Sequence, residues 1–499
     1  MRPPRRLVLT LAGLLGIGLL PLPAGSSIAD AAAPTDVVAV VVEGVGNGHG
    51  RGMSQWGAYG WAVDHGWSWV QILDHYYGGT SNGTVDVNGR IRVRLTALDG
   101  LGTVGLISQG GGVIWNGQTY ASMQARRNAS GTFDVLGSTA LACNTTLTVP
   151  DGPILKGATG DAVRQIQQFL TQFGFNPGGV DGQFGNLTEA AIVRFQASKG
   201  LGQDGQWQAE EAAAARSMIA AGGTAATFTF IGTSASPRFE TPAGETATTA
   251  LGLCQPNGTV THYRGRVDVV NDAGTTRVVN DVAVEDYLRG VVPKEISASW
   301  AVAGAGRGAE AVRAQAVAAR SYGLEQNRYG YATTCDTQAC QVYAGSATRT
   351  VASGVATLVE DFRTDQAIAA TAGVVRRWPN GSIVSTEFSA SNGPRTAGGA
   401  FPARDDAPGD STASNPNHRW TRILDADSLG AQYGIGTLTG ATMVDAQSST
   451  NRQFDGVWFN DIVLTGTAGS RRIPAWDFRG AHGLPSPGFE VNVITRDSV

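Results

Sequence analysis

The stretch Asp286–Trp300, DYLRGVVPKEISASW, carries Glu295 among apolar neighbours. Two valines and a proline lie shortly before this carboxylate, and Ile296 follows it directly. A carboxyl group that loses contact with water shifts toward its protonated form, and a Glu that is protonated at neutral pH can act as a general acid. A lone Glu beside a proline is also typical of a surface loop, where the side chain only caps the backbone or faces solvent. The surrounding sequence therefore has to distinguish a general acid from a structural loop residue.

The segment Ala309–Tyr322, AEAVRAQAVAARSY, predicts a helix because most of its residues have high helix propensity. Its surface is mostly alanine, which allows another part of the backbone to pack closely against it. Gln315, Arg320 and Tyr322 are among the few polar groups that it offers. We interpret this helix as the centre of the fold, and we expect Gln315 and Arg320 to position a ligand near Glu295.

A glycine-rich stretch, Gly46–Ala58 or GNGHGRGMSQWGA, follows a β-branched run over Val37–Val42 that predicts a strand. The glycines allow positive φ or a close approach of the backbone to another group. A phosphate-binding loop is excluded, because the Lys-Ser/Thr ending of that motif is absent. The stretch offers His49, Ser54 and Gln55 as polar groups, and His49 fits a structural turn as well as a substrate contact.

Taken together, VVPKE, the alanine-rich helix and GHGRGMSQWGA resemble the SpoIID/LytB domain, named for stage II sporulation protein D and an amidase enhancer. The resemblance implies an α+β fold, in which a β-rich core surrounds a central catalytic helix. It also implies that Glu295 is the catalytic residue of a peptidoglycan lytic transglycosylase that needs no cofactor. In many relatives the glycine-rich motif comes late in the domain, so the order of segments here indicates a circularly rearranged core.

The stretch Ser389–Thr396, SASNGPRT, resembles a hydroxyl-rich loop of the same family, with Pro394 in place of a glycine. We expect Ser389 and Ser391 to contact a sugar, and we expect the same of His49, Ser54 and Gln55. A simple hydroxyl-rich turn would have the same composition as residues 389–396. Around this loop the sequence predicts a strand over residues 382–388, a surface loop over residues 401–420, a strand over residues 462–466, and a strand with a turn over residues 473–489.

Residues 150–222 differ in character from both flanks. Val163, Ile166 and Leu170 share one helical face, and a tight turn follows at Val180–Gly185. The spacing resembles the three-helix peptidoglycan-binding domain, whose groove binds the stem peptide; a helical spacer without binding is the alternative. Because the SpoIID resemblance continues afterwards, we predict one core over residues 32–149 and 223–499, with a small all-α domain inserted between them.

The N-terminus predicts a secretory signal over residues 1–31, with arginines, an apolar run over Leu7–Leu20 and the small-residue site Ala29–Ala31. An uncleaved anchor is the alternative interpretation. No later stretch predicts a membrane span, so the mature chain is expected at the cell wall, outside the cytoplasmic membrane. The net charge of −4 gives no indication of nucleic-acid binding.

The four cysteines are even in number, which favours disulfides in an exported protein. Cys335 and Cys340 are close enough to bridge locally, and Cys143 and Cys254 flank the predicted insertion. Some relatives bind zinc around the close pair, but two cysteines without a third nearby ligand make a weak zinc site. We therefore predict two disulfides and no metal.

These observations favour cleavage of glycan strands with a single carboxylate. Most glycosidases use two carboxylates, whereas a lytic transglycosylase uses the C6 hydroxyl of the sugar itself as nucleophile and leaves a 1,6-anhydro end. The expected partners are the glycan strands and stem peptides of peptidoglycan. Two alternatives stay open: a non-catalytic enhancer that acts with a cell-wall amidase, and an ordinary muramidase that adds water.

Overall fold

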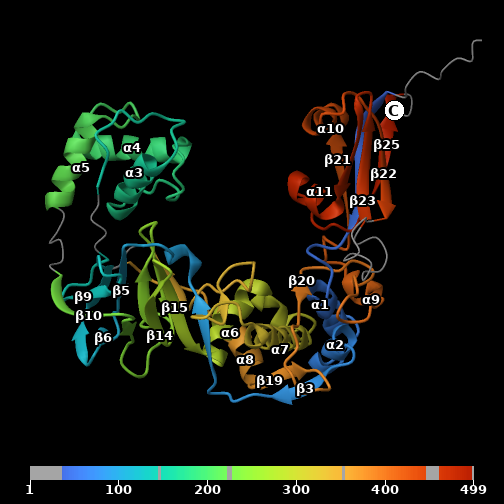
Figure 1. The fold of residues 1–499 in the computed structure, drawn as a ribbon, viewed down its shortest axis with the longest axis horizontal. Coiled ribbons are helices and arrows are strands. Elements are labelled where there is room, and N and C mark those ends of the chain that lie inside the picture. The colour runs from blue at the N-terminus through green and yellow to red at the C-terminus, as the bar shows by residue number, and fades with distance from the viewer. Residues whose placement is uncertain (1–35, 144–147, 222–227, 351–353, 446–459, 497–499) are drawn as a thin grey trace, which may run out of the picture.

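The computed structural model describes residues 36–143, 148–221, 228–350, 354–445 and 460–496, and the predicted signal segment lies outside these ranges. The fold is α+β. A central body of helices and sheets carries a three-helix unit above one end and a C-terminal sheet unit above the other (Figure 1).

The helix predicted at the centre forms as α7, Ala309–Glu325. Its alanines allow close approach, and four helices pack around it: α1 (Gln55–Val63), α2 (Trp69–Tyr76), α6 (Val284–Glu295) and α8 (Phe362–Ala370). Residues Ala311–Ser321 of α7 are mostly buried, with Arg313 as the more accessible exception. The small side chains thus place several backbones within reach of one another.

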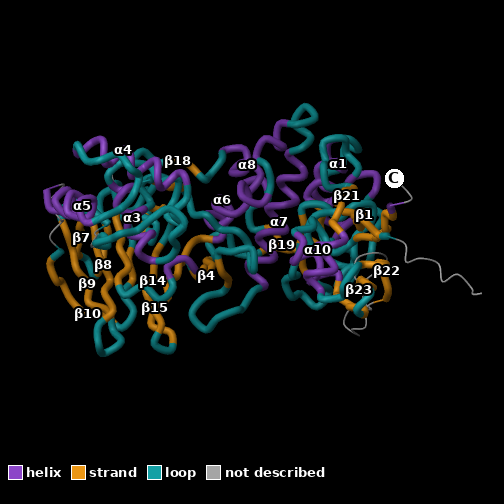
Figure 2. The backbone as a smooth tube through the Cα atoms, turned by 90° about the horizontal axis from the view of Figure 1, so that it is seen from above, coloured by secondary structure: helices purple, strands orange, loops and turns teal. Residues whose placement is uncertain are grey.

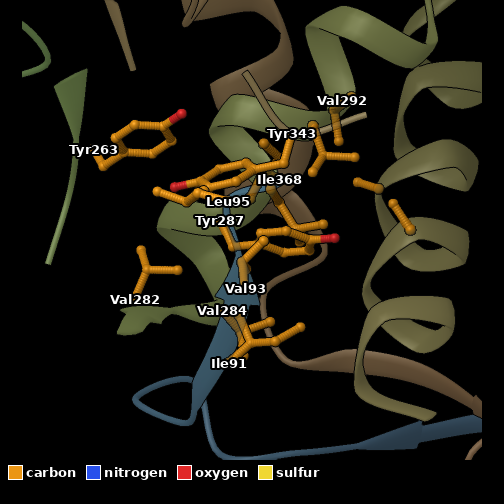
Figure 3. Packing of buried hydrophobic residues seen from close by; sticks show 14 of the residues in the cluster. Ile91, Val93, Leu95, Tyr263, Val282, Val284, Tyr287, Val292, Tyr343 and Ile368 are labelled. Atoms are coloured by element: carbon orange, nitrogen blue, oxygen red, sulfur yellow. The ribbon is translucent and has the colours of Figure 1, made fainter. Parts of the chain in front are cut away.

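Helix α6 ends at Glu295 and is anchored by aromatic packing (Figure 3). The rings of Tyr287, on this helix, and Tyr343 lie 5.0 Å apart. Ile91 and Val93, from strand β4, belong to the same buried cluster. This rigid base fixes the position of the last turn of α6, which carries the predicted acid.

Two large sheets complete the central body. The eight-stranded sheet runs β10 (Thr229–Ser234), β9 (Phe133–Ser138), β8 (Ser122–Arg127), β5 (Thr103–Ile107), β12 (Leu251–Cys254), β13 (Val260–Tyr263), β17 (Ala347–Arg349) and β18 (Thr357–Leu358). The five-stranded sheet runs β11 (Arg238–Phe239), β14 (Arg266–Asp272), β15 (Thr275–Ala283), β4 (Arg90–Arg94) and β16 (Thr334–Cys335). Three two-stranded sheets also form: β19 (Val374–Arg377) with β3 (Ser81–Thr84), β6 (Val113–Trp115) with β7 (Gln118–Tyr120), and β2 (Met53–Ser54) with β20 (Phe388–Ser389). Short 3₁₀ helices span Thr96–Leu98 and Ala298–Val302.

In the sequence, the three-helix unit is inserted between β9 and β10, which are neighbouring strands of the eight-stranded sheet. It consists of helices α3 (Asp161–Gln172), α4 (Asn186–Lys199) and α5 (Ala209–Ala221) (Figures 1 and 2). Phe169, Phe195 and Trp207 belong to its buried core. The chain leaves the sheet at the end of β9 and returns along β10, which is antiparallel to it. The two connections therefore start and end side by side.

The C-terminal unit is built around the first strand of the described residues. Strand β1 (Val37–Val45) lies between β21 (Arg419–Asp425) and β25 (Phe489–Thr495). A second sheet and two helices cover a separate core: β22 (Leu438–Asp445), β23 (Asn460–Gly466), β24 (Gly469–Pro474), α10 (Ala426–Tyr433) and α11 (Ala475–His482). Strand β1 runs directly from this unit into the glycine-rich loop of the central body.

Three sequence-based expectations about local structure are wrong. Residues 382–388 form no continuous strand: Ile383 makes an isolated bridge to Arg377, and the strand β20 spans only Phe388–Ser389. Residues 473–489 contain helix α11 between their strand segments. Residues 401–420 are not a simple surface loop, because they include the short helix α9 (Ala407–Asp410) and the fully buried Asp406.

Candidate active site

The glycine-rich loop packs against the segment around β20, although the two are far apart in sequence. Strands β2 and β20 pair in parallel, and Asn47 bridges to Ser391. Gly52 has a φ of +64°, and a Cβ atom there would lie 2.0 Å from the carbonyl oxygen of Glu387. The glycine is therefore required both for its conformation and for this close approach, which brings the loop next to the hydroxyl-rich segment.

Glu295 lies half-buried at the last position of α6. The backbone N–H of Val342 donates a hydrogen bond of 2.9 Å to its Oε1 atom. Burial raises the pKa of Glu295 above its ordinary value, and the bond from Val342 opposes only part of that rise. No Lys or Arg of the described residues lies within ion-pair distance of it, so the carboxyl group has no cation to hold it ionised.

A cleft of about 730 Å³ lies in front of Glu295. The glycine-rich loop, the ends of α6 and α7, the segment around β20 and helix α11 form its walls. Of the residues predicted for the site, Glu295, His49, Gln55 and Ser389 line it. The other lining residues are Asn47, Gly48, Arg51, Lys294, Tyr322, Arg328, Gln338, Cys340, Gln341, Val342, Glu387, Phe388, Ala390, Trp476 and Arg479.

His49 is held by its own loop and by Ser389. The backbone N–H of Arg51 donates to its Nδ1 atom at 3.0 Å, and the Ser389 hydroxyl lies 3.1 Å from the same atom. Burial and the charge of Arg51 lower the pKa of His49 to about 4, with Glu387 opposing and Arg479 adding to the effect. The ring is therefore neutral near pH 7, and since Nδ1 accepts, its proton is carried on Nε2.

Glu387 is a second carboxylate in the cleft, and sequence reasoning missed it. The Nε and terminal nitrogen atoms of Arg51 contact both of its oxygens at 2.7–3.2 Å. Burial alone would raise the pKa of Glu387, but the hydrogen bonds and charge of Arg51 lower it. The two residues are 336 positions apart, so no sequence spacing indicates the pair.

Ser54 and Ser391 do not line the cleft, and both are fully buried. The Ser54 hydroxyl accepts from the N–H of Gly57 at 2.9 Å and so caps helix α1. The Ser391 hydroxyl donates to the carboxylate of Asp410 at 2.6–2.7 Å. Contacts with a substrate, which the sequence suggested for both, are not open to them in this structure.

Gln315 and Arg320 are also fully buried and do not reach the cleft. Gln315 lies behind Gln55, whose amide donates to its Oε1 atom at 3.3 Å. Arg320 donates to both oxygens of Glu285 at 2.6–2.9 Å and thereby ties α7 to the first turn of α6. The polar group that α7 contributes to the cleft is instead Tyr322.

The structure joins Cys335 to Cys340 and Cys143 to Cys254. The first bridge closes the loop that continues into Val342, the donor to Glu295. The second joins the chain shortly after β9 to the end of β12. Among the described residues, no three His, Cys, Asp or Glu side chains gather in a way that suits a metal ion.

Comparisons with known proteins give two family matches. Residues 272–378 match the Stage II sporulation protein family, and residues 159–214 match the Putative peptidoglycan binding domain family. The chain is 35% identical over 106 residues to the Amidase enhancer of Bacillus subtilis, covering 21% of this chain and 12% of that protein. It is 42% identical over 59 residues to the Zinc D-Ala-D-Ala carboxypeptidase of Streptomyces albus G, covering 11% of this chain and 22% of that protein.

Among solved structures, the SleB N-terminal domain matches with 33% identity, 14% coverage of this chain, 99% coverage of that chain and a TM-score of 0.14. The chain spans only 12% and 22% of the length of these two curated relatives. No helix within the described ranges is long and apolar enough to cross a membrane. The two family matches confirm both resemblances: the chain contains a stage II sporulation protein segment, which includes Glu295, and a peptidoglycan-binding-domain segment.

Proposed function

We propose that this chain is a secreted cell-wall protein that binds peptidoglycan and cleaves its glycan strands as a lytic transglycosylase. The observation that carries the proposal is the state of Glu295. It faces a cleft large enough for sugar rings, burial raises its pKa, and no cation among the described residues pairs with it. A protonated carboxyl group near neutral pH is what a general acid requires.

In the proposed reaction the Glu295 carboxyl group donates its proton to the glycosidic oxygen between N-acetylmuramic acid and N-acetylglucosamine. The bond from the muramic-acid C1 atom to that oxygen breaks, and the carboxylate then takes the proton of the C6 hydroxyl of the same sugar. The C6 oxygen bonds to C1 and gives the 1,6-anhydro end. Because the nucleophile is part of the substrate, proximity replaces a second protein group.

Other groups of the cleft would bind and orient the sugar. Neutral His49, with its proton on Nε2, can donate a hydrogen bond without competing for the proton of Glu295. The amide of Gln55 and the ring of Tyr322 lie on the same cleft. The ionised Glu387 places a negative charge beside the cationic transition state that glycosidic cleavage develops.

The remaining parts of the proposal concern organisation and location. We assign residues 150–222 to an inserted domain that binds the stem peptide, because the strands before and after it in the sequence, β9 and β10, pair with each other and because its core is separate. Residues 32–149 and 223–499 would then form the catalytic core. The similarity to wall-associated families supports a place outside the cytoplasmic membrane after removal of the signal over residues 1–31.

The test is to incubate the purified chain with peptidoglycan in the absence of any amidase and to identify the products by mass spectrometry. The lytic proposal predicts muropeptides with 1,6-anhydro ends from the wild type and none from Glu295→Gln. Unchanged thermal unfolding of the variant would show that the fold is intact. Retained cleavage by Glu295→Gln would refute the assignment.

A second candidate function is hydrolysis by a pair of carboxylates, and the presence of Glu387 in the cleft favours it. Glycosidases pair one raised and one lowered carboxyl pKa in this way. We prefer the single-acid reaction because both oxygens of Glu387 are bound by Arg51, which limits its capacity as a base or nucleophile.

A third candidate is a non-catalytic enhancer of a cell-wall amidase, which the match to the Amidase enhancer favours. The same incubation separates it from the others. An enhancer would release no glycan fragments alone, but it would increase peptide release when an amidase is added.

A further inference from the structure

Helix α11 presents one face to the cleft while its other face is packed into the C-terminal unit. Ala475 and Phe478 are buried in the core of that unit. Trp476 and Arg479 line the cleft, and residues three apart share a helical face. The Arg479 guanidinium carbon lies 5.1 Å from the centre of the Trp476 ring, which is 46% exposed. A large apolar ring and a cation thus form one combined surface.

This surface is fixed against the glycine-rich loop. The carbonyl oxygen of Pro485 accepts from Arg479 Nε at 3.1 Å and from the N–H of Gly48 at 3.1 Å. The Ser486 hydroxyl donates to the carbonyl oxygen of Val45 at 2.6 Å. These hydrogen bonds hold Arg479 next to His49 and link the C-terminal unit to the loop.

The charge of the cleft indicates what this wall binds. Lys294, Arg328 and Arg479 have no carboxylate within 4.0 Å in the part of the chain that the structure describes, whereas Arg51 is paired with Glu387. A half-buried guanidinium without an anionic partner is well suited to bind a planar carboxylate through two hydrogen bonds. A rigid tryptophan supplies apolar contact area at a low cost in conformational entropy, and the C–H face of a hexose is a matching apolar surface.

We propose that Trp476 and Arg479 form a specificity subsite, in which the Trp476 ring stacks on a hexose and Arg479 binds a carboxylate carried next to that hexose. The inference rests on the proposed function in one respect, that the ligand of the cleft is a peptidoglycan glycan. Such a carboxylate comes from the lactyl group of a peptide-free muramic acid or from a stem peptide. Both residues act in positioning and not in the chemical step.

The test measures binding by titration calorimetry with the full chain carrying Glu295→Gln, which prevents turnover. Three glycans of equal length serve as probes: an N-acetylglucosamine oligomer, an alternating N-acetylglucosamine–N-acetylmuramic acid oligomer without peptide, and the same oligomer with stem peptides. Arg479→Gln is expected to weaken the binding of a carboxylate-bearing probe by about 10- to 100-fold, the effect of a charge-assisted hydrogen bond. The affinity for the uncharged probe should not change. The probe that loses affinity identifies the source of the carboxylate.

Trp476→Ala is expected to weaken all three probes by a similar factor of about ten, and Trp476→Phe to retain most of the affinity. Arg479→Lys should restore part of the preference for a carboxylate. The matched control is Arg471→Gln, an exposed arginine on β24 of the same unit that does not line the cleft. It removes the same charge from the unit and should change none of the affinities.

The proposal is overturned if Arg479→Gln affects charged and uncharged probes alike, if Arg471→Gln has the same effect as Arg479→Gln, or if Trp476→Ala leaves the uncharged probe unchanged. Failure of the lytic function gives a different result. In that case the wild type would release no anhydro ends, while the binding differences that depend on Arg479 would persist.

Discussion

Glu295 and Glu387 line the same cleft, yet their surroundings shift their pKa values in opposite directions. Burial raises the pKa of Glu295, which receives one backbone hydrogen bond from Val342. Burial acts on Glu387 as well, but Arg51 binds both of its oxygens and lowers its pKa. The comparison teaches that a cationic partner, more than burial, determines which carboxylate keeps its proton, and it supports the acid role that we propose for Glu295.

The largest effect on the rate of glycan cleavage is expected from replacing Glu295, which has no cationic partner among the described residues. Glu295→Gln should lower the rate of glycan cleavage by about 10²- to 10⁴-fold, the usual contribution of a general acid. Initial rates on purified peptidoglycan measure this, with the melting temperature as the check on folding. The wild-type rate should also fall as pH rises through the raised pKa of Glu295, because only the protonated form donates. A variant that cleaves at the wild-type rate would remove the distinction between the two glutamates.

Glu285 is a third glutamate, and it lies in the first turn of α6, at the opposite end from Glu295. Glu285 is paired with the fully buried Arg320, and this ion pair stabilises the fold. Replacing Arg320 by Gln leaves this partly buried carboxylate without its partner and should lower the free energy of unfolding by about 3–5 kcal/mol. Urea denaturation measures the change. A loss of activity at unchanged stability would instead indicate the ligand-positioning role that the sequence suggested.

Asp406 resembles Glu295 in being buried without a Lys or Arg partner among the described residues. Burial raises its pKa from 3.8 to about 6, with Asp410 adding to the rise; the nearby His75 ring and hydrogen bonds from Tyr76 and Trp61 oppose it. Because the folded pKa is above the unfolded one, its contribution to stability is complete below about pH 4 and is lost as pH rises through about 6, roughly 3 kcal/mol at most.

The variant Asp406→Asn should therefore flatten the decrease in stability between pH 4 and pH 7, since the amide does not titrate. Thermal unfolding at several pH values in this range measures the slope. An identical slope in both proteins would show that burial without a cation does not raise this pKa, and it would weaken the same argument for Glu295.

The smallest effect is expected at the paired glutamate. Glu387→Gln removes a charge that in our proposal only helps to stabilise the cationic transition state. We therefore expect a rate loss of less than about tenfold and unchanged product ends. The same mass spectrometric assay measures both. A loss as large as that of Glu295→Gln would make the two glutamates a catalytic pair and favour hydrolysis.

Local sequence features were sufficient to predict part of this structure. The alanine-rich composition predicted α7, and the glycines of the N-terminal motif predicted a loop of close approach, as Gly52 shows against Glu387. Helix α6 lies outside these predictions; Pro293 occupies its last turn, and proline weakens any helix signal from propensity. Glu295 could be named as a candidate acid because its apolar neighbours are local in sequence, and its catalytic role stays a prediction.

The other site residues depend on contacts between distant segments. Arg320 and Gln315 are polar residues on a central helix, and nothing in the sequence indicates that Glu285 and Gln55 meet them in the interior. Trp476 lies in a segment that predicted a strand and a turn, so its place on the cleft depends on a helix that sequence reasoning missed. Site residues fixed by long-range packing need the structure.

The most direct test of the central claim is cleavage of peptidoglycan by the purified chain in water enriched in heavy oxygen, followed by mass spectrometry of the newly formed muramic-acid ends. If Glu295 directs intramolecular attack by the C6 hydroxyl, the fragments carry 1,6-anhydro ends that contain no heavy oxygen, and Glu295→Gln yields none. Heavy oxygen at the newly formed ends would contradict the account and show a hydrolase.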